Sequence, residues 1–160
     1  MTTSIKRVAY PTPEIFDTIK SFYLGLQIGE HEYESLRDIT TQQARLMFHE
    51  YQKTSQEDSS FEYYMAFTDA VPSGFIEFST EDEIENTYKK YLRINSIYVV
   101  KEFRNQGIAT MLLKTAEDRA KILGFSYIGL GALLQNSPAL NLYKKFGFDE
   151  YGIELVKHVK

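Results

Sequence analysis

The chain has 160 residues and contains no cysteine. This absence excludes a thiol nucleophile, an acyl-cysteine intermediate, a disulfide framework and every thiolate metal site. The three histidines, His31, His49 and His158, are scattered without the spacing of metal ligands, so we expect no bound metal. A chain without cysteine also fits a reducing compartment.

Long apolar runs are missing as well. No stretch of about 18 apolar residues is present, so we expect no membrane span. The opening residues, 1–7, lack the apolar core of a signal peptide. There is no internal repeat, low-complexity tract or flexible linker. Together with 43% hydrophobic and 25% charged residues, these absences predict one globular domain over residues 1–160, located in the cytoplasm.

Positive charge is scarce overall but unevenly distributed. The formal net charge is −4, which argues against nucleic-acid binding. Residues 1–93 hold nine Lys/Arg and sixteen Asp/Glu, a net charge of −7. Residues 94–147 hold seven Lys/Arg and three Asp/Glu, a net charge of +4. This division predicts two surfaces for two oppositely charged ligands.

Hydrophobic spacing and turn residues predict the order of strands and helices. Strands are expected at residues 4–9, 61–68, 74–79, 91–100 and 125–130, with one or two more over 148–159. Helices are expected from Pro13 to near Gly25, from Thr40 or Thr41 to about Tyr51, over 108–123, and over 138–146. The fold class is therefore α+β with one β-α-β segment.

Two motifs suggest chemistry. A predicted strand leads through Arg104-Asn105-Gln106-Gly107 into a helix, whose first N–H groups and dipole favour an anion. Twenty-nine residues after Gly107, the sequence continues as Asn136-Ser137-Pro138-Ala139-Leu140-Asn141-Leu142-Tyr143-Lys144-Lys145-Phe146-Gly147-Phe148. In order and at this spacing, the two motifs indicate more than a helix that begins after a charged turn.

The motifs together resemble those of the GNAT superfamily of N-acetyltransferases. The cofactor loop of that family reads Arg/Gln-x-x-Gly-x-Gly/Ala and is matched by Arg104, Gly107 and Ala109. Its later motif, Asn-x-x-Ala-x-x-x-Tyr-x-x-x-Gly-Phe, is matched by Asn136, Ala139, Tyr143, Gly147 and Phe148. The resemblance implies a mixed, mostly antiparallel sheet flanked by about four helices. It also implies a splay between the fourth and fifth strands, where acetyl-CoA binds without a metal.

The resemblance also assigns residues to the cofactor. The pantetheine arm would pair with backbone groups of Ile97, Tyr98, Val99 and Val100. The pyrophosphate would lie on the backbone of Arg104, Asn105, Gln106, Gly107, Ile108, Ala109 and Thr110. Asn136 and Ala139 belong to the same site, and Lys144 and Lys145 either meet the adenosine phosphates or are solvated helix charges.

The predicted reaction is direct attack of an amine on the thioester in a ternary complex. The resemblance places Tyr143 beside the thioester sulfur, where a phenol can give a proton to the departing thiolate. The identity of the general base is undecided, because residues 91–95 contain no acidic residue where some relatives have a glutamate. Glu77, inside an apolar strand, is the candidate, with an outward-pointing Glu77 as the alternative; Tyr98 orienting a water is a further option.

Charge suggests the acceptor. Two acidic segments, with Glu30, Glu32, Glu34 and Asp38 in one and Glu81, Asp82, Glu83 and Glu85 in the other, fall where the family forms its acceptor wall. A negative entrance concentrates cationic amines, although solvated loops explain the same charges. Alternatives are acetylation of protein or peptide α-amino groups, a non-catalytic acyl-CoA-binding module, and a generic phosphate-binding domain. The sequence leaves open whether the chain forms a homodimer.

Overall fold

The computed structural model describes residues 1–8, 13–33, 42, 60–79, 91–155 and 157. These residues include five strands, three α-helices and a short 3-10 turn, η1 (Lys101–Phe103), after the fourth strand. The strands are β1 (Thr3–Val8), β2 (Phe61–Thr68), β3 (Val71–Ser79), β4 (Leu92–Val99) and β5 (Ile128–Leu130). The helices are α1 (Pro13–His31), α3 (Ile108–Leu123) and α4 (Ser137–Phe146). The second predicted helix, near 40–51, lies outside the described residues except for position 42.

The strands form one sheet in the order β1-β2-β3-β4-β5. The first three pairings are antiparallel and the pairing of β4 with β5 is parallel, as predicted for a mixed, mostly antiparallel sheet. β5 pairs only with Leu92, Arg93 and Ile94, so β4 continues to Val99 without β5 beside it. The predicted splay between these strands is therefore present.

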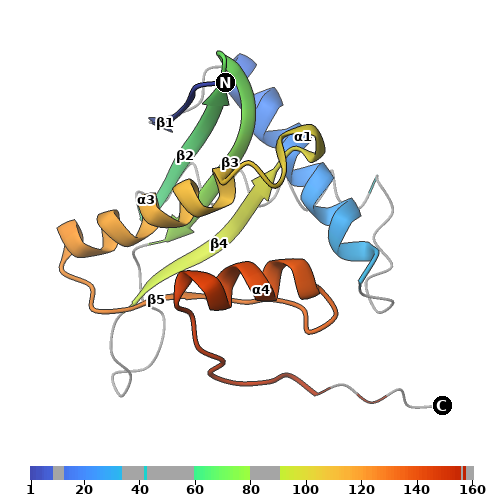
Figure 1. Cartoon of the computed structure of the whole chain (residues 1–160), viewed down its shortest axis with the longest axis vertical. Helices are drawn as coiled ribbons and strands as arrows, with labels where there is room; N and C mark the ends of the chain where they lie inside the picture. Colours follow the sequence, from blue (N-terminus) through green and yellow to red (C-terminus); the bar gives the residue numbers. More distant parts are fainter. Residues whose placement is uncertain (9–12, 34–41, 43–59, 80–90, 156, 158–160) are drawn as a thin grey trace.

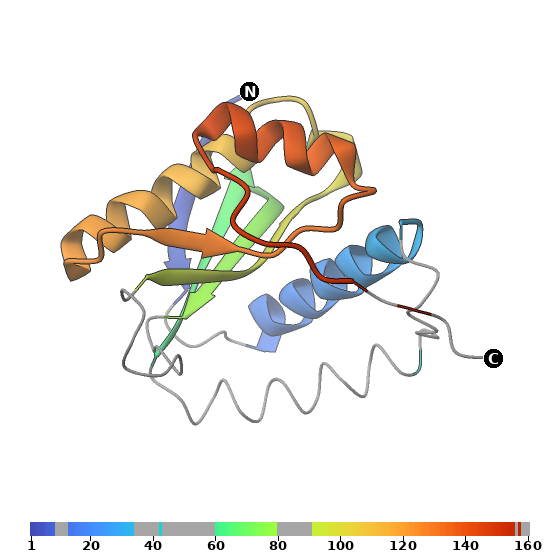
Figure 2. The same ribbon diagram turned by 90° about the horizontal axis from the view of Figure 1, so that it is seen from below.

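Helices cover both faces of the sheet (Figures 1 and 2). On one face, Ile19 and Phe22 of α1 pack on Met65 and Phe75 of the sheet. On the other face, α3 supplies the largest share of a second core, and α4 packs against its edge; the buried members from α3 are Ile108, Leu112, Leu113, Ala116 and Ala120. Because strand side chains alternate between faces, β3 contributes to both cores, with Phe75 in the first and Ile76 and Phe78 in the second.

Two helix and turn boundaries differ from the sequence prediction. α1 continues beyond Gly25 to His31, and Gly25 lies inside the helix where a Cβ would meet the Tyr98 side chain of β4. The hairpin between β2 and β3 turns at Asp69 and Ala70, which have φ values of 47° and 68°, so β3 begins at Val71 and not at Gly74. A two-residue turn with both φ values positive matches the twist of paired strands.

The predicted final strand is wrong over residues 148–155, which form no strand. Tyr151, Ile153 and Leu155 do alternate, but they are 92%, 68% and 84% exposed. A strand requires a hydrogen-bonded neighbour as well as alternation. Residues 156 and 158–160 lie outside the described part of the chain.

Candidate acetyl-CoA site

The loop between β4 and α3 turns through two residues with left-handed backbone. Asn105 has φ 61° and Gly107 has φ 82°. Gly107 is the N-cap of α3 and has no side-chain cap, while the N–H of Met111 donates to the Gly107 carbonyl at 3.0 Å. The N–H groups of residues 108–110 consequently have no acceptor within the helix. Turns of this kind form a concave site for an anion.

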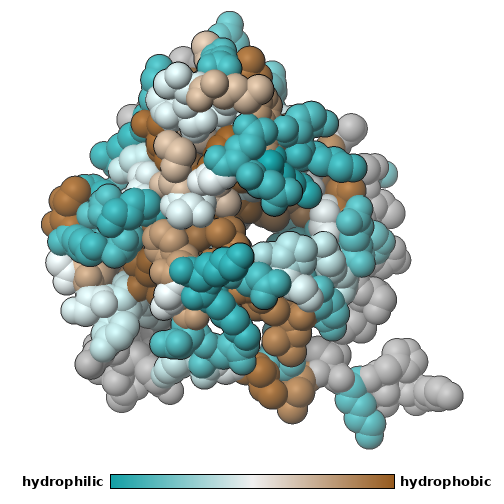
Figure 3. Space-filling model, in the orientation of Figure 1, coloured by the Kyte–Doolittle hydropathy of each residue, from teal (hydrophilic) through white to brown (hydrophobic). Residues whose placement is uncertain are grey.

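Space is available over this turn. A Cβ on Gly107 would meet nothing within 4 Å. The opened flank of β4 leads to the turn, since β4 loses its β5 partner after Ile94. In the space-filling view, the surface is hollowed between β4 and α4 (Figure 3). A pyrophosphate at the turn and an extended pantetheine along β4 therefore fit the residues present.

The backbone of β4 is fixed by its other neighbour. Ile97 and Val99 pair with Ile76 and Gly74 of β3, and the N–H of Val100 donates to the Ser73 carbonyl at 3.0 Å. A bulge next to Glu77 shifts the register between β3 and β4. These contacts hold the predicted pantetheine segment, 97–100, in extended form with one flank toward the hollow.

Asn136 caps α4. Its side-chain oxygen accepts a hydrogen bond from the Ala139 N–H at 3.2 Å, and a proline follows in the first turn. This cap ties the amide of Asn136 to the start of the helix. The Nδ2 group is the donor that remains to serve a ligand.

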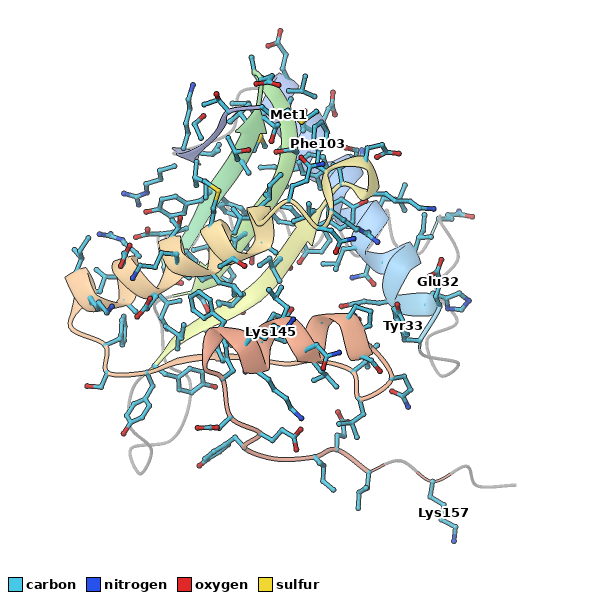
Figure 4. The ribbon with its side chains drawn as sticks, viewed as in Figure 1. Met1, Glu32, Tyr33, Phe103, Lys145 and Lys157 are labelled. Atoms are coloured by element: carbon cyan, nitrogen blue, oxygen red, sulfur yellow. The ribbon has the colours of Figure 1, made fainter. Side chains whose placement is uncertain are left out.

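Tyr143 belongs to α4. Its half-buried ring packs beside Phe148, with the two ring centroids 5.9 Å apart. Burial, and second the negative charge of Glu30, raise the pKa of Tyr143 to about 12. The phenol is therefore neutral at ordinary pH and keeps a proton to donate. Glu30 lies near the end of α1, just before Glu32 and Tyr33, which are labelled in Figure 4. This end of α1 lies close to the start of α4 in both ribbon views.

The two lysines of α4 differ. Lys144 forms an ion pair of 2.6 Å with Glu150. Hydrogen bonding to Lys144 lowers the pKa of Glu150. Lys145, labelled in Figure 4, is exposed and stays a candidate for the adenosine phosphates.

Glu77 is fully buried, with 0% of its surface exposed, so the alternative of an outward-pointing side chain is wrong. Asn95 Nδ2 donates to Glu77 Oε1 at 3.3 Å. Glu77 pairs with Ser96, whose hydroxyl donates to Tyr23 Oη of α1 at 2.9 Å. Glu77 thus lies on the face of the sheet that α1 covers, whereas Tyr143 belongs to α4.

Sequence reasoning did not single out two features of the site. Glu30 appeared only as one of several acidic residues, yet its charge acts on Tyr143. Arg104 appeared as a motif residue whose backbone would bind the pyrophosphate, yet its side-chain Nε also donates to the Val99 carbonyl at 3.0 Å. Both contacts join different elements of the fold, and no local pattern signals them.

No group of three or more metal-ligating side chains occurs within the described residues. Within the same residues, no helix is both long and apolar enough to cross a membrane. The acidic residues 34, 38, 81–83 and 85, proposed for the acceptor, lie outside the described residues.

A mixed sheet that opens beside its fourth strand, next to a helix start whose first N–H groups have no acceptor within the helix, defines a GNAT-like fold. A model described as the acetyltransferase (GNAT) family matches residues 26–148. The chain belongs to this family, and the resemblance carried by the two motifs is confirmed. The predicted class, an acyltransferase, is the class to which the family belongs.

An N-alpha-acetyltransferase from Sulfurisphaera tokodaii is 31% identical over 103 residues, which cover 60% of this chain and 60% of that protein. The chain thus matches less than two thirds of that relative's length.

Solved structures agree with the fold. A GCN5-related N-acetyltransferase from Ralstonia eutropha has a TM-score of 0.74 at 16% identity, with 99% of both chains covered. Aminoglycoside N-acetyltransferase AAC(6')-Iy in complex with CoA has a TM-score of 0.72 at 14% identity, covering 99% of this chain and 95% of that chain. At such identities the likeness shows the fold alone, and the predicted fold class is confirmed.

Proposed function

We propose that the chain transfers an acetyl group from acetyl-CoA to a primary amine, most simply a small cationic amine. The observation that carries the proposal is the opened flank of β4 leading to the uncapped start of α3. Membership in the GNAT family and a neighbour solved with CoA support acetyl-CoA as the co-substrate.

The chain's residues would bind acetyl-CoA at two places. Backbone groups of residues 97–100 would pair with the pantetheine arm. The N–H groups of residues 104–110 would bind the pyrophosphate, with Asn136 Nδ2 and Lys145 as further donors. Hydrogen-bond donors fixed by the fold need no reorganisation when the ligand arrives, which favours binding.

Tyr143 would act as the general acid. The amine nitrogen attacks the thioester carbonyl carbon, an N–C bond forms, and the C–S bond breaks. The leaving sulfur carries the electron pair and takes the phenolic proton, and the proton that the attacking nitrogen loses on forming the amide returns the Tyr143 phenolate to phenol. Burial raises the pKa of Tyr143 to about 12, so the phenol carries its proton at neutral pH. Positioned proton donors of this kind contribute about 10²–10⁴-fold to a rate.

Glu77 would accept the proton that the ammonium must lose before it attacks, through an intervening water. Its burial and its hydrogen bond to Asn95 support a fixed carboxylate near the α1 side of the sheet. Glu77→Gln keeps the shape and removes the base, so kcat/KM should fall while the Kd for CoA stays constant. A variant with unchanged kcat/KM would remove Glu77 from the reaction.

Charge supports a cationic acceptor. The charge of Glu30 contributes, after burial, to the raised pKa of Tyr143, so negative charge reaches the part of the site where the acceptor would bind. One structural neighbour is named an aminoglycoside N-acetyltransferase, and aminoglycosides carry amino groups that are cationic at neutral pH. Reversing the charges of Glu81, Asp82 and Glu83 should raise KM for cationic amines most strongly at low salt. Identical kinetics across a salt series would contradict this role.

Acetylation of peptide α-amino groups is the second candidate, because the relative from Sulfurisphaera tokodaii is named an N-alpha-acetyltransferase. A non-catalytic acyl-CoA-binding module is the third. One panel separates the three: polyamines, an aminoglycoside and short peptides with free N-termini, each with acetyl-CoA, followed by release of the CoA thiol. Turnover of the first group supports the proposal, turnover of peptides alone favours the second candidate, and CoA binding without turnover favours the third.

A further inference from the structure

The side chain of Tyr98 connects α1 to the end of β4. Its ring centroid lies 5.7 Å from that of Phe22 in α1. One turn along α1, a Cβ on Gly25 would come within 2.7 Å of Tyr98 Cζ. The absence of a side chain at Gly25 therefore lets α1 cross directly over the Tyr98 phenol.

The same ring supports Arg104. The guanidinium carbon of Arg104 lies 5.8 Å from the Tyr98 ring centroid, within the range of a cation–π contact. The Nε group of Arg104 donates to the Val99 carbonyl at 3.0 Å. The guanidinium therefore lies against β4, although Arg104 is the first residue of the loop that leads into α3.

We infer that Arg104 and Tyr98 form a clamp that fixes the loop 104–107 to β4 and α1. Arg104 would then be a positioning residue. Its guanidinium on the Tyr98 ring and its Nε–H on the Val99 carbonyl would hold the loop in place for acetyl-CoA, and its charge would not act directly on the phosphate. The inference rests on the proposed function, because acetyl-CoA is the ligand proposed for the loop.

Arginine and lysine separate these roles. Lysine keeps the positive charge but has neither an Nε–H in a fixed plane nor a flat surface that stacks on a ring. Arg104→Lys preserves a point charge and breaks the clamp. Tyr98→Leu removes the ring, whereas Tyr98→Phe keeps the ring and removes only the hydroxyl.

The test measures the Kd for CoA by calorimetry on the full chain, without an acceptor, after thermal melting shows each variant to be folded. We expect Arg104→Lys and Tyr98→Leu each to weaken CoA binding by about three- to tenfold, the size of a lost cation–π contact. Tyr98→Phe should bind CoA more tightly than Tyr98→Leu, because it keeps the ring that faces Arg104. The double variant Tyr98→Leu/Arg104→Lys should have a Kd for CoA no higher than that of the single variant that binds CoA less tightly, because both substitutions break the same clamp.

Two glycines of α1 provide a matched pair. Gly25→Ala inserts a methyl group against Tyr98, whereas a Cβ on Gly29 would meet nothing within 4 Å. Both changes favour the helix, but only Gly25→Ala should raise the Kd for CoA. Equal Kd values for the two variants would contradict the link between α1 and the loop.

Two results would overturn the clamp: Arg104→Lys binding CoA as well as the unmodified chain, or losses that multiply in the double variant. A readout without CoA separates this inference from the proposed function. The Arg104 Nε–H signal in ¹H–¹⁵N spectra, assigned by its absence in Arg104→Lys, should be protected from exchange and lose protection in Tyr98→Leu. If the unmodified chain fails to bind CoA, the proposed function fails, and this signal still decides whether the clamp exists.

Discussion

Glu62 on β2 and Arg119 on α3 join the sheet to the helix through three hydrogen bonds of 2.6–3.0 Å. Glu62 is buried, with 5% of its side chain exposed, while Arg119 is 23% exposed. Arg7 of β1 and the hydroxyl of Tyr64 also reach the Glu62 carboxylate, at 3.4 Å and 3.2 Å. The hydrogen bonds to Glu62 raise the pKa of Arg119, and burial followed by the charge of Glu62 raises that of Tyr64.

Arg119→Met should destabilise the fold, because it leaves most of the charge of a buried carboxylate without its bidentate partner. We expect a loss of about 3 kcal/mol in the free energy of unfolding, measured by urea denaturation at neutral pH. Lys114→Met on the same helix is the control, since Lys114 is 52% exposed and its ion pairs with Glu117 and Asp118 are at the surface. That control should lose much less stability, because ion pairs between exposed side chains contribute little to folding. Equal losses would mean that the Glu62–Arg119 pair adds nothing beyond a surface pair.

Gly107→Ala should weaken acetyl-CoA binding. Gly107 and Gly124 bracket α3 with φ values of 82° and 79°, and a Cβ on either would meet nothing within 4 Å. Alanine at each position should therefore cost about 1–2 kcal/mol of stability through left-handed strain alone. Only Gly107 belongs to the proposed phosphate site, so Gly107→Ala should raise the KM for acetyl-CoA severalfold and Gly124→Ala should not. A similar KM for the two variants would place the pyrophosphate elsewhere.

Tyr143→Phe should lower kcat by about 10²-fold or more, the contribution of a positioned general acid. The Kd for CoA should remain within twofold, because the ring and its contact with Phe148 are kept. Tyr127→Phe is a suitable control, since Tyr127 is 50% exposed and belongs to no proposed step. An unaffected kcat in Tyr143→Phe would remove the acid from the mechanism.

Tyr143 should titrate later than an ordinary tyrosine, whose pKa is about 10. Burial and the charge of Glu30 raise its pKa to about 12. A pKa that is higher in the folded state means that this group's contribution to stability is complete below about pH 10 and is lost between about pH 10 and 12. ¹³C NMR of the tyrosine Cζ atoms should show a late titration that Tyr143→Phe removes, while Tyr64, whose pKa is also raised, should keep its late titration in that variant. In Glu30→Gln the Tyr143 titration should shift to lower pH, and an unmoved midpoint would exclude Glu30 as a cause.

Most of the elements could be predicted because their signals are local. The start of α1 at Pro13, the glycine after α3 and the bounds of β2 follow from residues within one turn or one strand. Predictions failed where a boundary depends on a distant neighbour. Gly25 lies inside α1 against Tyr98 and does not end the helix, and residues 148–155 form no strand although their apolar side chains alternate.

The amino-acid sequence by itself determined the family and the parts of the site that are contiguous in the chain. The turn at Gly107 and the cap at Asn136 are built from neighbouring residues, so a motif contains nearly all of their physics. Only the tertiary structure decided which side chains from separate elements meet. The burial of Glu77 and the action of Glu30 on Tyr143 arise from packing of helices on the sheet. The contact of Arg104 with Tyr98 depends on how the chain turns back on itself after β4. Such contacts depend on the relative placement of whole elements, which no spacing along the chain specifies.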